Sequence, residues 1–129
     1  MKIFEHGEPS PTTHERYSGP VDLQTLVVSP NPADADVLRA KYAPGTVTNW
    51  HSHPGGQYLY VLSEGAWIGN EEDGSVHVGQ GTLIVVPPGE RHWHGSIDGD
   101  EAVFLILNWG MTRWEDTSVA PSLTSASSA

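Results

Sequence analysis

Short apolar stretches, separated by Gly- and Pro-rich turns, follow one another along most of the chain. Because successive side chains of a β-strand point to opposite faces, alternating apolar and polar residues favour half-buried strands. No segment shows the longer period of an amphipathic helix. We expect strands at residues 21–29, 37–42, 47–53, 57–62, 66–69, 75–78, 82–86, 91–94 and 102–109. This set of short strands predicts an all-β sandwich or barrel.

Two of these segments also predict what their faces contact. The run 57–62 alternates, with Gln57, Leu59 and Val61 on one face and Tyr58, Tyr60 and Leu62 on the other. If Gln57 points inward, the tyrosines cover the outer face, which indicates a homodimer surface or, alternatively, a second packed sheet. In the run 82–86 four apolar residues follow Thr82, which predicts a buried strand.

The length of 129 residues is that of one domain with a single core. Residues 1–20 are polar and Pro-rich, and we interpret them as an N-terminal arm. Residues 21–116 contain the expected strands and form the predicted barrel. Residues 117–129 are small and polar, so we expect a disordered tail that buries too little surface to offset its ordering entropy.

Charge and cysteine content exclude several classes of partner and chemistry. The formal net charge is −10, with 6 Lys and Arg, which argues against nucleic acid or an anionic membrane as partner. The absence of Cys restricts any metal site to nitrogen and oxygen donors. No apolar run approaches the roughly 20 residues of a membrane span, and the first residues lack the apolar stretch of a signal peptide. We therefore expect a cytoplasmic protein that acts on a small molecule.

Four of the seven histidines form two His-x-His pairs, His51 with His53 and His92 with His94, each beside a Gly- and Pro-rich turn. On a strand, the two imidazoles of each pair share one face. Neutral imidazole is a ligand for Mn, Fe, Co, Ni, Cu and Zn, so two converging strands would offer one ion three or four nitrogens. The zinc-protease pattern His-Glu-x-x-His and the Gly-x-Ser-x-Gly elbow of serine hydrolases are both absent.

The spacing of these residues resembles the two motifs of the cupin family. The first motif, Gly-x5-His-x-His-x3-Glu-x6-Gly, matches at Gly45, His51, His53, Gln57 and, one residue late, Gly65. The second motif, Gly-x5-Pro-x-Gly-x2-His-x3-Asn, matches at Gly81, Pro87, Gly89, His92 and Ser96. Motifs and connection cover about 40% of the chain. The resemblance implies a single-domain cupin, a small antiparallel β-barrel of the jelly-roll type.

The same resemblance implies a metal held inside the barrel by His51, His53, Gln57 and His92. Gln57 stands where the family usually has Glu, so it offers an amide oxygen without charge. A divalent ion would then keep its full charge, which lowers its affinity and sharpens its Lewis acidity. The alternative for Gln57 is that it only caps the turn.

A closer resemblance involves His-x-His-Pro-x-Gly-Gln and Pro-Gly-x-x-His-Trp-His-Gly. These segments are similar to a subgroup of small bacterial cupins that includes manganese-dependent hydroxynitrile lyases and cupins related to carboxymuconolactone decarboxylases. In those lyases the metal holds the cyanohydrin oxygen and nearby histidines move protons. His94 is then a candidate general base or acid, with a fourth-ligand or structural role as the alternative. These lyases carry a further His about where this chain has Phe104.

Three functions follow from these observations. The first is a metal-dependent small-molecule enzyme of the lyase, cyclase, decarboxylase or isomerase type, with Mn expected and Fe, Zn, Ni, Co or Cu as alternatives. The second is an Fe- or Cu-dependent cupin dioxygenase, because three histidines leave open metal positions for O₂. The third is a non-catalytic cupin that binds a metal or ligand.

Overall fold

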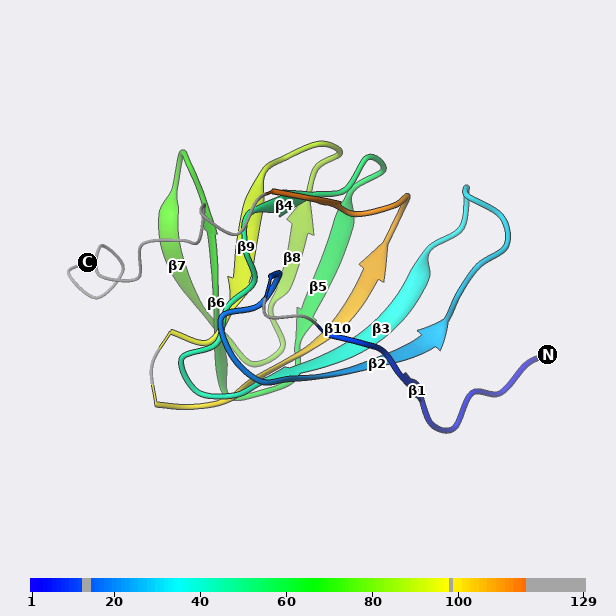
Figure 1. Ribbon diagram of the computed structural model, residues 1–129, viewed down its shortest axis with the longest axis horizontal. Coiled ribbons are helices and arrows are strands. Elements are labelled where there is room, and N and C mark those ends of the chain that lie inside the picture. Colours follow the sequence, from blue (N-terminus) through cyan, green and yellow to red (C-terminus); the bar gives the residue numbers. More distant parts are fainter. Residues whose placement is uncertain (13–14, 98, 116–129) are drawn as a thin grey trace.

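A computed structural model describes residues 1–12, 15–97 and 99–115, and within these ranges the chain forms two antiparallel β-sheets without a helix (Figure 1). The strands are β1 (Glu8–Pro9), β2 (Val21–Val27), β3 (Asp36–Tyr42), β4 (His51–Ser52), β5 (Gln57–Val61), β6 (Gly65–Asn70), β7 (Gly74–Gly79), β8 (Leu83–Val86), β9 (His92–Gly95), β10 (Ala102–Asn108) and β11 (Arg113–Trp114). The all-β prediction is confirmed. The boundary expected at residue 116 and the tail expected over 117–129 lie outside the described residues.

The two sheets face each other and enclose the core. One sheet has the order β1-β2-β3-β10-β5-β8, and the other has the order β11-β4-β9-β6-β7. The neighbours in each sheet are mostly distant in sequence, as in the jelly-roll arrangement. Ala40, Leu59 and Phe104 from the central strands of the six-stranded sheet are each fully buried. The core therefore lies on the inner face of this sheet.

The strand β5 alternates as its sequence predicts. Gln57, Leu59 and Val61 are buried, whereas Tyr58 and Tyr60 are 40% and 41% exposed. Gln57 therefore points into the barrel, and the tyrosines lie on the outer face of the six-stranded sheet. This orientation makes Gln57 available to an interior site.

The prediction of a buried strand at 82–86 is wrong for one of its two faces. Ile84 and Val86 point inward, but Leu83 and Val85 are 52% and 57% exposed. The cause is that, among the described residues, no strand packs over the outer face of the six-stranded sheet at β5 and β8, so Tyr58 and Tyr60 of β5 are exposed as well. The apolar surface on this face extends to β5, since Leu83 pairs with Tyr60.

The strand expected over 47–53 is shorter in the structure, where only His51–Ser52 is regular. The backbone before it bonds alternately to two different segments. The N–H of Thr48 donates to the carbonyl of His94 at 2.9 Å, and that of Asn49 donates to the carbonyl of Arg16 at 2.8 Å. This stretch therefore forms backbone hydrogen bonds both to β9 and to the segment that follows β1, instead of pairing with a single strand.

Part of the segment predicted as an arm contacts the barrel. The strand β1 pairs with β2 at the edge of the six-stranded sheet, and Tyr17 is 8% exposed. The centroid of the Tyr17 ring lies 5.6 Å from that of Trp114 and 6.3 Å from that of Tyr42.

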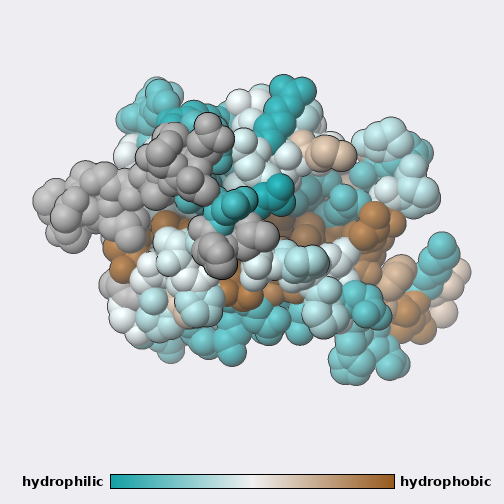
Figure 2. All heavy atoms as spheres, viewed as in Figure 1, coloured by the Kyte–Doolittle hydropathy of each residue, from teal (hydrophilic) through white to brown (hydrophobic). Residues whose placement is uncertain are grey.

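The face shown in Figure 2 is mostly hydrophilic, with apolar residues visible between the polar ones. Within the described residues, no helix has the length and apolarity to cross a bilayer.

Candidate metal centre

The predicted ligands converge at one end of the barrel, although they come from both sheets. His51 and His92 are paired across β4 and β9 of one sheet, and Gln57 begins β5 of the other. A turn connects His53 to Gln57, in which Gly56 has φ +93° and donates its N–H to the carbonyl of His53. Glycine adopts this backbone conformation without strain. The chain can therefore place His53 and Gln57 on the same interior point.

Three histidines form a compact and buried group. One ligand atom from each of His51, His53 and His92 lies within 4.8 Å of the others. All three residues are at most 2% exposed. These separations are compatible with first-row metal ions, whose bonds to imidazole nitrogen are about 2 Å long.

Backbone carbonyls fix the ring orientation of two of these histidines. Nδ1 of His51 lies 2.8 Å from the carbonyl oxygen of Asn49, and Nδ1 of His92 lies 3.0 Å from that of Glu90. A carbonyl oxygen only accepts, so each Nδ1 carries the ring proton. The Nε2 atoms of both rings then present lone pairs to the interior. This arrangement is typical of histidines that bind metals.

The environment of Gln57 is the observation that best fits a bound cation. Its Oε1 lies 2.7 Å from Nε2 of His92, and its Nε2 donates to Oδ1 of Asn108 at 2.7 Å. The bond to Asn108 fixes the amide so that oxygen faces the histidine. Oε1 and Nε2 of His92 are therefore two acceptors that face each other without a proton between them. Such a buried pair is unfavourable unless a cation lies against both atoms, so the donor set fits a metal ion.

The imidazoles at this site are neutral at ordinary pH. Burial lowers the pKa of His53 to about 3, and the neighbouring His92 contributes to this shift. Burial also lowers the pKa of His92, to about 4. Burial, and then the neighbouring histidines, hold the pKa values of His51 and His94 well below 6.5. Neutral imidazoles bind metals without first losing a proton.

His94 lies beside this group but has different partners. Its backbone N–H donates to Oγ1 of Thr48, and its Nδ1 lies 3.1 Å from the hydroxyl oxygen of Tyr42. The ring of Phe104 packs edge-on against it, with centroids 5.4 Å apart. Within the described residues, Nε2 of His94 and Nε2 of His53 are both buried without a hydrogen-bond partner. The two atoms are available to a bound ion or molecule.

These groups open onto a cavity of about 190 Å³. His51, His53, Gln57 and His94 line it together with Tyr42 and Asn108, and Arg16, Thr112 and Trp114 also contribute. Thr112 lies near His53, with 3.2 Å between Oγ1 and Nδ1. The cavity is polar where the histidines lie, and its volume suits a small molecule.

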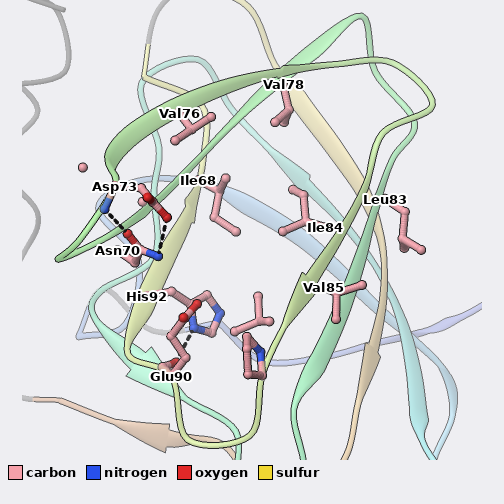
Figure 3. Close-up of a pocket in the computed structure, with 14 residues that line it drawn as sticks. Ile68, Asn70, Asp73, Val76, Val78, Leu83, Ile84, Val85, Glu90 and His92 are labelled. Carbon is pink, nitrogen blue, oxygen red and sulfur yellow. Dashed lines mark hydrogen bonds between the residues drawn. The ribbon is translucent and has the colours of Figure 1, made fainter.

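A larger hollow of about 450 Å³ lies between β7 and β8 (Figure 3). Aliphatic side chains, among them Ile68, Val76 and Ile84, form its walls. Only His92 among the four clustered histidines borders this hollow. His51, His53 and His94 therefore face the smaller cavity rather than this hollow.

Sequence analysis missed several partners of the site. Tyr42 lies on β3, where it pairs with Ala102 of β10. Its hydroxyl contacts His94, which is 52 residues away in the sequence. Thr112 reaches His53 from 59 residues away. The alternation of β3 puts Tyr42 on the same face as Ala40, but only the tertiary fold reveals that it meets a histidine. No local motif marks these residues.

Residues 38–108, more than half of the chain, match the cupin domain family. Together with the jelly-roll sheets and the three clustered histidines, this match shows that the chain belongs to the cupins. A cupin-like protein of known structure from Thermotoga maritima is similar, with 28% identity, a TM-score of 0.75 and coverage of 90% of both chains.

Two curated relatives are enzymes. The (R)-mandelonitrile lyase of Granulicella tundricola is 34% identical over 80 residues, which are 62% of this chain and 61% of the lyase. The acireductone dioxygenase of Rhodopseudomonas palustris is 34% identical over 70 residues, which are 52% of this chain and 39% of that protein. The chain thus spans less than two thirds of the length of either relative.

Proposed function

We propose that this cupin is a metal-dependent enzyme that acts on a small molecule, with His51, His53, Gln57 and His92 as ligands. The observation that carries the proposal is the 2.7 Å contact between the acceptor atoms of Gln57 and His92, which a cation would stabilise. Manganese is the expected ion because the two motifs resemble those of manganese-dependent lyases. When bound, the ion would supply Lewis-acid polarisation of a substrate oxygen.

The residues of the chain define how a substrate would be held. Gln57 is neutral and is oriented by Asn108, so it leaves the charge of a divalent ion uncompensated. His94 lines the same cavity with an unpartnered Nε2, and we assign it as the catalytic group beside the ion. The cavity of about 190 Å³ limits the reacting part of the substrate to a small group.

The nearest named activity is the cleavage of a cyanohydrin into an aldehyde and hydrogen cyanide. Support comes from the 34% identity to a mandelonitrile lyase. The difference is Phe104, which is fully buried against His94 where the resembled lyases carry a histidine. We therefore propose lyase-type chemistry on a hydroxyl or carbonyl compound, with mandelonitrile as the first probe.

The test is metal reconstitution followed by an assay. Metal-free protein is loaded separately with Mn, Fe, Zn, Ni, Co and Cu, and benzaldehyde release from mandelonitrile is measured. We expect turnover in at least one loaded form, and none in metal-free protein or in His92→Ala. A fully loaded His92→Ala protein that remains active would contradict the proposed ligand set, and inactivity of every loaded wild-type form would contradict this activity.

A cupin dioxygenase is the second candidate. It is supported by the similarity to acireductone dioxygenase and by a ligand set that leaves coordination positions open. Iron- or copper-loaded protein that consumes O₂ with an enediol substrate, while Mn- and Zn-loaded protein does not, would favour this function. A protein that binds metal but turns over neither class of substrate would favour a binding role.

We also propose that the protein is a homodimer. The outer face of the six-stranded sheet carries four adjacent apolar side chains, each at least 40% exposed: Tyr58, Tyr60, Leu83 and Val85. Tyr58 pairs with Val85 and Tyr60 with Leu83, so they form one continuous surface. The protein has a net charge of −10, so two copies repel each other over much of their surface. Association through this uncharged apolar face would avoid that repulsion and bury exposed apolar side chains.

A further inference from the structure

Tyr42 and His94 form a buried pair next to the ligand cluster. The Tyr42 hydroxyl oxygen lies 3.1 Å from Nδ1 of His94, and the two residues are 1% and 2% exposed. Among the described residues, no other acceptor lies within hydrogen-bond distance of this hydroxyl. Burial raises the pKa of Tyr42 well above 10, so the hydroxyl keeps its proton. The direction of this hydrogen bond therefore decides which nitrogen of His94 carries a hydrogen.

The two possible directions differ in how many polar atoms they leave unpaired. If His94 donated from Nδ1, both the Tyr42 hydroxyl proton and the lone pair on Nε2 would lack partners. If Tyr42 donates, only the N–H at Nε2 lacks one. Each unpaired buried polar group is unfavourable, so donation by Tyr42, which leaves fewer of them, is favoured. His94 then has the opposite tautomer to His51 and His92, whose Nδ1 atoms donate to backbone carbonyls.

We propose that Tyr42 holds His94 with its proton on Nε2, so that His94 donates a hydrogen bond to an oxygen of the bound substrate. This inference rests on the proposed function and defines the role of His94 within it. His94 would be neither a fourth metal ligand nor a base, because both roles need a lone pair on Nε2. Tyr42 is a positioning residue, since it acts through His94.

The same pair opposes complete transfer of the Nε2 proton. Transfer to a substrate oxygen would leave an imidazolate unless the Tyr42 proton moved to Nδ1. That second transfer would create a buried phenolate, which burial disfavours. His94 therefore keeps its proton and stabilises negative charge as it develops on the oxygen. The substrate class that benefits contains alcohols or carbonyl compounds whose oxygen becomes anionic during reaction.

The test reads the tautomers directly, by long-range ¹H–¹⁵N correlation spectra of protein labelled at histidine. Signals of His94 are assigned by their loss in His94→Gln. In metal-free wild type we expect His94 to be protonated at Nε2, and His51 and His92 to be protonated at Nδ1. After loading with diamagnetic Zn, the Nε2 signals of the three ligand histidines should shift, while His94 keeps its Nε2 proton.

Tyr42→Phe is the informative variant, because it removes only the hydroxyl. We expect the His94 tautomer to shift towards a mixture of both forms. Tyr17→Phe is the matched control, since Tyr17 lines the same cavity but makes no hydrogen bond to His94. It should leave the His94 signals unchanged.

Three results would overturn the inference. The first is an unprotonated Nε2 of His94 in metal-free wild type, and the second is a Zn-induced shift of this atom as large as those of the ligand histidines. The third is an unchanged His94 tautomer in Tyr42→Phe. If Tyr42→Phe fails to fold, the wild-type and Zn spectra still decide. Failure of mandelonitrile turnover with the expected tautomers would contradict the proposed activity alone.

Discussion

The Nε2 of Gln57 donates to Oδ1 of Asn108 at 2.7 Å, across β5 and β10, where the two residues are paired. This contact decides which atom of the Gln57 amide faces His92. We predict that Asn108→Ala lets the amide rotate and weakens metal binding by roughly 10- to 100-fold, as loss of such supporting contacts generally does. Asn108→Asp keeps the acceptor and is the control. Competition with a chromophoric chelator measures the metal affinities of both variants. Equal affinities in wild type and Asn108→Ala would refute the positioning role of Asn108.

Replacing Gln57 by Glu tests the consequence of a neutral ligand. A carboxylate adds a negative charge next to the ion, so metal affinity should rise by roughly tenfold, about 1.4 kcal/mol. The same charge reduces Lewis acidity, so turnover of any substrate should fall even with the site fully loaded. Gln57→Leu, which offers no oxygen, should lose affinity. Isothermal titration with Mn and with Zn gives these constants, and unchanged affinity in both variants would exclude Gln57 as a ligand.

Metal-free protein should lose stability in acid because the buried histidines of the candidate site are neutral when the chain is folded. The pKa of His53 is about 3 and that of His92 about 4, against 6.5 for the unfolded chain. Between these values the unfolded state binds more protons, so the free energy of unfolding rises with pH. Each histidine contributes up to about 1.4 kcal/mol per pH unit within this window, and little above pH 6.5.

Urea unfolding with a chelator present, at pH 7.5 and pH 5, measures this dependence. The variant His53→Gln should show a smaller loss between the two pH values, because it removes one of the groups that titrate on unfolding. A loss as large as that of wild type would show that other groups, such as carboxylates, dominate.

Gly95 is predicted to be intolerant of any side chain. Its φ is +150°, and an added Cβ would lie against the carbonyl oxygen of Thr46 and 2.8 Å from Cα of Val47. Gly95→Ala should therefore lower the free energy of unfolding by about 2 kcal/mol or more. Gly99→Ala, where a Cβ meets nothing within 4 Å, is the control and should be nearly neutral. Similar midpoints for the two variants would show that the chain relaxes at this contact.

The proposed dimer surface predicts a charge-sensitive association. Tyr60→Asp places a carboxylate in the centre of the apolar face and should shift the protein from dimer to monomer in sedimentation velocity. Val76→Asp changes an equally exposed apolar residue, 40% against 41% for Tyr60, on the other sheet. This control should remain dimeric. Dimers in both variants would place the interface elsewhere, and monomers in wild type would refute the proposal.

Local patterns predicted most of the strands, and the two His-x-His pairs predicted the clustering of His51, His53 and His92, because both depend on short-range spacing. The spacing of the two His-x-His pairs predicted that their imidazoles converge, whereas Gln57 was identified as a candidate ligand from the resemblance to the first cupin motif. Whether another layer covers the outer face of a sheet is not a local property, so the exposed face of β8 was missed. The same holds for 47–53, where the backbone bonds to two segments. It also holds for the contacts of Tyr42 with His94 and of Asn108 with Gln57, which join positions 52 and 51 residues apart.

The proposed ligand set would also determine how strongly a metal can stabilise the fold. His51 and His92 belong to one sheet and Gln57 to the other, so a bound ion would join the two layers. Yet His51, His53 and Gln57 lie within seven residues of sequence, and an unfolded chain can still gather them around an ion. Such residual affinity subtracts from the stabilisation that metal gives to the native state. The rise in melting temperature on loading should therefore be smaller than native affinity alone implies, because only His92 must be recruited from a distance.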